Sequence, residues 1–127
     1  MPVKFSVVAR KNPADQTKAA KYYAQAVTDG EATTKELAKR ISMISTVGYT
    51  DTFAVISALM EIIPDELKNG RTVRLGELGS LYIGNKSEGS VKADEVTASN
   101  IISARVGFRP GAEFRKLVKI LDWEKQS

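Results

Sequence analysis

The 127-residue sequence predicts an α+β protein, and two side-chain patterns carry that prediction. Between residues 34 and 67, apolar side chains recur every three or four positions, which is the period of a helix. Over 3–9, and again in short segments at 73–75, 81–83 and 102–108, apolar and polar residues alternate, which is the period of a strand. We therefore expect two helices, a three-stranded antiparallel sheet with a long β-arm and a short C-terminal helix, plus added N-terminal β-strands.

The N-terminal extension, residues 1–32, begins with a clear strand pattern. Apolar residues occupy alternate positions over 3–9, and the turn-forming residues 12–15 then break the pattern. Residues 21–27 predict a second strand, although the alanines in this segment would also suit a helix. The extension is therefore expected to hold one or two β-strands.

A capping box predicts where the first helix begins. Thr33 and Glu36 have the spacing at which each side chain bonds the backbone amide of the other residue. An amphipathic helix over 34–45 follows, and its apolar stripe comprises Leu37, Ile41 and Ile44.

A second, longer helix is expected to be capped by Thr50 and to end at Lys68-Asn69-Gly70. Its apolar stripe comprises Phe53, Ile56, Met60, Ile63 and Leu67. So broad an apolar arc needs more cover than one short helix provides. The helix either lies within a larger core or pairs with a copy of itself. Pro64 lacks a backbone donor, so we expect a kink or a restarted turn there.

The remaining sequence alternates short apolar segments with turns and polar stretches. The predicted segments are the strand 73–75, the turn Gly76-Glu77-Leu78-Gly79, a strand through Leu81 and Ile83, the polar arm 84–103, the strand 102–108, and a last helix after Pro110-Gly111.

The residue types exclude most catalytic chemistry. The chain has no cysteine and no histidine, which excludes disulfides, zinc held by Cys or His, thiol nucleophiles and imidazole bases. Asp94 and Glu95 are adjacent, so on a strand they point to opposite faces and form no catalytic pair. The turn 76–79 lacks the lysine and the glycine spacing of a phosphate loop. We expect no enzyme, no metal, no cofactor and no small-molecule substrate.

The charge distribution suggests a polyanionic partner. There are 19 Lys and Arg residues against 15 Asp and Glu, a formal net charge of +4. The basic surplus lies at the two ends, in residues 1–21 and 105–127. The N-terminus has no signal-peptide core, and no stretch approaches the roughly 20 apolar residues of a membrane helix. We therefore expect a soluble, cytoplasmic protein with no membrane partner.

The order of these segments resembles the bacterial histone-like DNA-bending family, HU and integration host factor. Residues 73–81 resemble the family's strand–turn–strand, and Phe108-Arg109-Pro110-Gly111 resembles the segment that leads from its arm into the last helix. Lys68-Asn69-Gly70 matches the end of the second helix, and 33–37 the start of the first. The resemblance covers 33–122, and together the order and spacing of these matches are specific.

The sequence departs from the family at three places. Residues 1–32 have no counterpart in the short members, which indicates a longer, divergent branch with an N-terminal extension. Glu77 and Leu78 replace a glycine and an aromatic residue in the turn. The family's arm is strongly basic and carries a wedge proline at its tip. Here the arm has no proline and no net charge, with Lys86, Lys92 and Arg105 against Glu88, Asp94 and Glu95.

The resemblance implies a bacterial, nucleoid-associated, IHF-like architectural protein. Two chains of the family interlock into a homodimer, whose arms hold double-stranded DNA through the minor groove. DNA bending and chromosome condensation are the associated roles. On this basis residues 33–122 form the HU/IHF-like DNA-binding domain, and 123–127 are a C-terminal tail.

The resemblance also indicates which residues carry these roles. The candidate DNA-binding residues are Arg109, Arg115, Lys86, Lys92, Arg105 and Lys116. The candidate dimer-core residues are Phe53, Ile56, Met60, Ile63 and Phe108.

Several alternatives remain open on the sequence. The cations of residues 1–21 form either a solvated strand face or an added phosphate-binding surface. Val96 or Ile101 either replaces the wedge proline or packs within the arm, and Tyr22 and Tyr23 either pack or stack on bases. The competing function is a dimeric structural or protein-interaction module that keeps the fold with weakened or lost DNA binding. The neutral arm and Glu77 of this chain favour that competing function.

Overall fold

The computed structural model describes residues 2–15 and 17–126 and separates into two compact units. One unit comprises Thr34–Lys116 and the other Met1–Thr33 with Leu117–Ser127. This division differs from the expected boundary after residue 122, because the end of the chain forms a strand in the N-terminal sheet rather than a tail.

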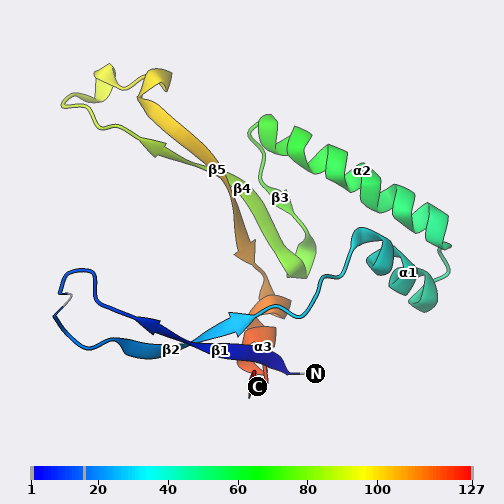
Figure 1. Ribbon diagram of the computed structural model, residues 1–127. Helices are drawn as coiled ribbons and strands as arrows, with labels where there is room; N and C mark the ends of the chain where they lie inside the picture. Colours follow the sequence, from blue (N-terminus) through cyan, green and yellow to red (C-terminus); the bar gives the residue numbers. More distant parts are fainter. Residues whose placement is uncertain (1, 16, 127) are drawn as a thin grey trace. The chain divides into compact units, whose positions relative to one another are not determined.

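The helical part of the larger unit consists of α1 (Thr34–Ile44) and α2 (Tyr49–Lys68), which pack against each other (Figure 1). Gly48, rather than Thr50, is the N-cap of α2. Its carbonyl oxygen accepts hydrogen bonds from the Thr52 amide at 3.0 Å and the Thr52 hydroxyl at 2.9 Å. The helix therefore begins at Tyr49, one residue before Thr50.

The end of α2 follows the expected stop signal. The helix continues through Pro64 to Lys68, and Asn69 is its C-cap. Gly70 has φ +85°, a conformation that glycine adopts without steric cost, and its amide bonds the Leu67 carbonyl at 3.0 Å. This left-handed residue turns the chain from the helix towards the first strand of the sheet.

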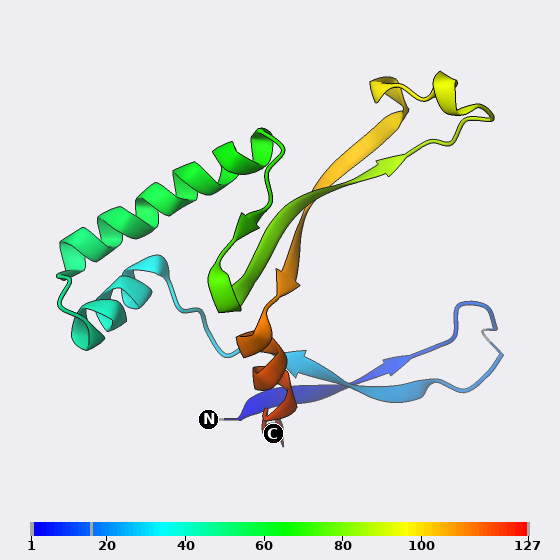
Figure 2. The ribbon, with the colours of Figure 1, turned by 180° about the vertical axis from the view of Figure 1, so that it is seen from behind.

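The sheet of this unit has the order β3-β4-β5 and is antiparallel. Its strands are β3 (Val73–Arg74), β4 (Gly79–Ser87) and β5 (Ile101–Pro110), with the short 3₁₀ turn η1 (Gly76–Leu78) between the first two. β3 pairs only with the start of β4, so most of β4 and β5 continues as a two-stranded arm (Figures 1 and 2).

The arm ends in an ordered tip that contains two 3₁₀ turns, η2 (Ala93–Glu95) and η3 (Ala98–Asn100). The Asn100 side-chain amide donates to the Ser90 hydroxyl at 3.0 Å and to the Glu88 carbonyl at 3.3 Å. A capping box joins Thr97 and Asn100. Asn100 therefore ties the two sides of the tip together.

The smaller unit is built on a three-stranded sheet with the order β2-β1-β6. β1 (Val3–Arg10) and β2 (Lys21–Val27) form an antiparallel hairpin, so residues 21–27 are a strand and not a helix. β6 (Trp123–Lys125) runs parallel to β1 on its other side. The last helix, α3 (Ala112–Lys119), precedes it in the chain.

Very little of the larger unit is buried within one chain. Among the described residues, Ala38 and Leu67 are the only buried apolar side chains. Large apolar residues on both helices are exposed to solvent, including Met60 at 56% and Ile44 at 86%. A folded domain normally removes such side chains from water, so this unit presents an apolar surface that its own chain does not cover.

No helix within the described ranges combines the length and the apolar character that crossing a membrane requires.

Candidate nucleic-acid interface

The pairing register of β4 and β5 gives the arm two different faces. Residues that pair directly across an antiparallel ladder lie on the same face. One face carries Leu81 opposite Phe108 and Ile83 opposite Val106, and is apolar. The other carries Ser80 opposite Arg109, Tyr82 opposite Gly107, Gly84 opposite Arg105 and Lys86 opposite Ser103. We call this second set of residues the basic face.

Two glycines let the long side chains of the basic face lie across the neighbouring strand. A Cβ on Gly84 would come within 2.7 Å of the Arg105 guanidinium carbon, and one on Gly107 would overlap the Tyr82 ring. The Arg109 guanidinium lies over that ring, 4.4 Å from its centroid. Such a cation–π contact contributes about 0.5–1 kcal/mol at an exposed site and orients the guanidinium.

Arg105 and Arg109 keep their hydrogen-bonding capacity available. Over residues 2–15 and 17–126, no ion pair or hydrogen bond engages either guanidinium. A guanidinium carries five N–H donors in a planar fork that suits phosphate oxygens. The basic face therefore presents two oriented guanidinium groups, without ion-pair partners among the described residues, to solvent.

The turn before β4 locks the end of β5 in place. Gly79 has φ +143°, and a Cβ there would collide with the Arg109 carbonyl. The Gly111 amide donates to the Leu78 carbonyl at 2.7 Å, and a Cβ on Gly111 would collide with the Glu77 carbonyl. These close backbone approaches fix the position of Arg109 relative to the turn.

Of the other candidate DNA-binding residues, Lys86 belongs to the basic face, and the remaining three lie on other elements. Lys92 is the residue before η2 in the arm tip, next to Asp94 and Glu95. Arg115 and Lys116 lie on α3, where Lys116 forms an ion pair with Glu113 at 3.9 Å. The structure thus groups Lys86, Arg105 and Arg109 on one face and separates the remaining three.

Two residues on this side of the sheet, Arg74 and Tyr82, were not among the predicted site residues. Arg74 pairs with Ser80, so it shares the face of Arg109, and Tyr82 orients Arg109 from the neighbouring strand. The strand alternation already indicates that Arg74 and Val73 point to opposite faces. The pairing of Arg74 with Ser80, which follows from the turn at 76–79, assigns Arg74 to the face of Arg109. No local signal in the sequence pairs Tyr82 with Arg109.

The candidate dimer-core residues lie on the uncovered apolar surface. Phe53, Ile56 and Ile63 are half-buried, and Met60 is exposed. Phe108 is 45% exposed and makes an edge-on contact with Phe114 of α3, with ring centroids 5.9 Å apart. Each of these residues has surface left for a further partner.

The part of the chain that the structure describes contains no cluster of three or more His, Cys, Asp or Glu residues that could hold a metal ion.

The helix pair, the three-stranded sheet and the projecting arm define an HU-like fold. The model of the HU-HIG family, an HU domain fused to a wHTH, Ig or glycine-rich motif, matches residues 1–125. The chain therefore belongs to the HU-HIG family. This confirms the resemblance to the histone-like family, and the match includes the extension 1–32.

Two solved structures share the fold. A candidate bacterial DNA-binding protein from Bacteroides vulgatus ATCC 8482 has a TM-score of 0.60 and 16% identity over 97% of this chain. The chain spans 48% of that protein's length. The HU protein of Anabaena, in a cocrystal with DNA, has a TM-score of 0.54 and 21% identity, and the match covers 69% of this chain and 98% of that one. No curated protein matches the chain.

Proposed function

We propose that this chain is a non-enzymatic, histone-like architectural protein that binds duplex DNA as a dimer. The observation that carries the proposal is the basic face of the arm, where Arg105 and Arg109 lie oriented and unpaired. Arg74 and Lys86 extend the same face along the sheet. Cations in such a row displace counterions from DNA phosphates, which gives affinity with little sequence specificity.

The uncovered apolar surface supports the dimer. α2 exposes Val55, Leu59, Met60 and Ile62 by 42–59% each. A second copy that interlocks its helices with these would remove them from water, at about 25 cal/mol per Å² of apolar surface. Two arms would then hold the duplex from two sides through phosphate and minor-groove contacts. The family relationship supports a nucleoid-associated, cytoplasmic role in which the DNA is bent and the chromosome condensed.

One observation favours the competing function, a protein-interaction module that has lost DNA affinity. Glu88, Asp94 and Glu95 lie in the arm tip, where the family places basic residues. These carboxylates would repel a phosphate backbone, but they lie beyond the basic face rather than on it. The base of the arm is therefore the part that we assign to DNA.

Fluorescence anisotropy of a labelled duplex of about 30 base pairs tests the proposal. We expect binding that weakens with salt, with a slope of log affinity against log salt of about −0.9 for each neutralised phosphate. The double variant Arg105→Gln/Arg109→Gln should flatten that slope by about 1.8 for each arm of the dimer that contacts DNA, and equally for unrelated duplex sequences.

The matched control is Lys39→Gln/Arg40→Gln, which removes the same charge from exposed positions of α1. It should leave the slope close to that of the unmodified chain. An unmodified chain that fails to bind duplex at low salt would contradict DNA binding and favour the interaction module.

A further inference from the structure

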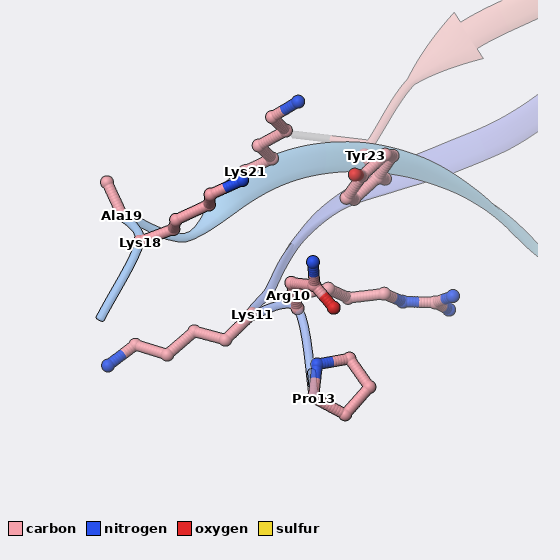
Figure 3. Close-up of a pocket in the computed structure, with 8 residues that line it drawn as sticks. Arg10, Lys11, Pro13, Lys18, Ala19, Lys21 and Tyr23 are labelled. Carbon is pink, nitrogen blue, oxygen red and sulfur yellow. The ribbon is translucent and has the colours of Figure 1, made fainter. Parts of the chain in front are cut away.

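A second basic surface lies in the smaller unit, at the end of the β1–β2 hairpin. Four cationic residues from both strands and the connecting loop surround a hollow of about 420 Å³ (Figure 3). The lining residues are Arg10, Lys11, Asn12, Pro13, Lys18, Ala19, Lys21 and Tyr23. None of these is acidic, so the hollow concentrates positive charge. We call this surface the hairpin cluster.

The hairpin cluster contains two cations in an unfavourable arrangement. Arg10 and Lys21 pair directly across the ladder, on the same face as Val8 and Tyr23. Like charges directly opposite each other destabilise an antiparallel pair. A bound phosphate backbone would offset this repulsion through its attraction to both cations.

The cations of the cluster have no carboxylate partner at ion-pair distance in the part of the chain that the structure describes. No ion pair involves Arg10, Lys11, Lys18 or Lys21 across residues 2–15 and 17–126. The nearest acid in sequence is Asp15, whose carboxylate accepts hydrogen bonds from the Thr17 hydroxyl at 2.5 Å and the Thr17 amide at 3.1 Å. These bonds lower the pKa of Asp15 below its usual range and hold the carboxylate in its own turn.

We propose that the hairpin cluster is a second phosphate-binding site, which takes the backbone of the same duplex that the arm binds. This inference rests on the proposed function. A hollow lined by one sign of charge raises the local concentration of anions. Its four cations and the absence of a lining carboxylate suit a backbone that carries one negative charge for about every 1.7 Å of duplex.

A second phosphate-binding site would compensate for the lack of positive charge at the arm tip. The arm of this chain is electrically neutral overall, so its basic face alone makes few phosphate contacts. Two sites on one chain bind a long polyanion more tightly than either alone, because binding at one raises the effective concentration at the other. The extension would then supply phosphate contacts that the neutral tip does not make.

The test is the triple variant Lys11→Gln/Lys18→Gln/Lys21→Gln in the full chain, measured by anisotropy on the same duplex. We expect affinity at 100 mM salt to fall at least tenfold and the salt slope to flatten by about 2.7 for each chain whose hairpin cluster contacts the duplex. The melting temperature without DNA should stay the same or rise, because Lys21→Gln removes the repulsion with Arg10. A merely structural cluster would lower it.

The matched control, Lys39→Gln/Lys119→Gln/Lys125→Gln, removes equal charge from exposed positions outside both basic surfaces. An equal loss of affinity in the control would overturn the proposal in favour of net charge. An unchanged slope in the hairpin variant, together with a flattened slope in Arg105→Gln/Arg109→Gln, would overturn the hairpin site and leave the proposed function intact. If the unmodified chain binds no duplex, both the hairpin site and the proposed function are contradicted.

If the hairpin variant instead loses binding to vesicles of anionic lipid and keeps its affinity for DNA, the cluster is assigned to a membrane surface.

Discussion

Gly107 and Gly84 are the residues that allow the cations of the arm to lie flat on the sheet. Each faces a large side chain across the ladder, Tyr82 in one case and Arg105 in the other. The absent Cβ leaves space that the ring or guanidinium occupies, so the orientation of Arg109 depends on a residue that touches no DNA itself. Single glycines in strands often mark such close approaches.

Gly107→Ala should therefore both destabilise the protein and weaken DNA binding. The new Cβ would overlap the outer atoms of the Tyr82 ring, so the ring must move aside, and the loss of this cross-strand contact should cost about 0.2–1 kcal/mol of unfolding free energy. Displacement of the ring also removes the stacking partner of Arg109, so affinity for duplex should fall several-fold. Urea unfolding and anisotropy measure the two effects.

Gly89→Ala is the control for this substitution. Gly89 lies in the arm, where a Cβ meets nothing within 4 Å, and its substitution should change stability by no more than about 0.5 kcal/mol. If the two variants behave alike, the close approach of Tyr82 to Gly107 has no energetic role.

At the scale of elements, the arm has a basic face along its paired strands and an acidic tip. The basic face follows β4 and β5, whereas Asp94 and Glu95 lie on η2 beyond the ladder. Asn100 holds the tip in one conformation through bonds to Ser90 and the Glu88 carbonyl. These bonds keep the tip, and with it the carboxylates, at the end of the ladder.

Neutralising the tip should strengthen DNA binding. In Asp94→Asn/Glu95→Gln the tip no longer repels phosphates, and we expect affinity to rise by about 2- to 10-fold at low salt, with a smaller gain at high salt because screening weakens the repulsion. Anisotropy titrations at two salt concentrations give this difference. Asp51→Asn/Glu61→Gln on α2 makes the same change of charge away from the arm and should have a smaller effect. Equal gains in the two variants would show that net charge alone is responsible.

The sequence predicted the elements well because their signals are local. The helix over 34–45 is found as Thr34–Ile44, and the stop at Lys68-Asn69-Gly70 ends α2 as expected. β6 was missed because a three-residue strand has no period to detect. Its pairing with β1 connects residues more than 100 positions apart, which no local pattern encodes.

At the scale of the whole molecule, the exposed apolar surface of the helices supports the proposed dimer. Among the described residues only Ala38 and Leu67 are buried apolar side chains. So small an interior cannot offset the conformational entropy that folding removes. Association with a second copy would supply the missing burial.

Light scattering should accordingly give the mass of a dimer, and the unfolding midpoint should rise with protein concentration. Met60→Asp places a charge at the centre of the α2 stripe and should abolish both the dimer and cooperative unfolding. Ala54→Asp places the same charge on the face of α2 that carries Glu61, away from that stripe, and should leave the dimer in place. A monodisperse, stably folded monomer of the unmodified chain would contradict the proposed assembly.

The sequence by itself determined the α+β class, the order of helices and strands, and the resemblance to the histone-like family. These depend on side-chain period, capping and turn residues, all of which act over a few positions along the chain. Only the tertiary structure decided that Arg74, Arg105 and Arg109 share one face of the sheet, and that Arg10 lies opposite Lys21. The physical reason is register: a shift of one residue in strand pairing moves every side chain to the other face, and long-range backbone hydrogen bonds rather than local sequence set that register.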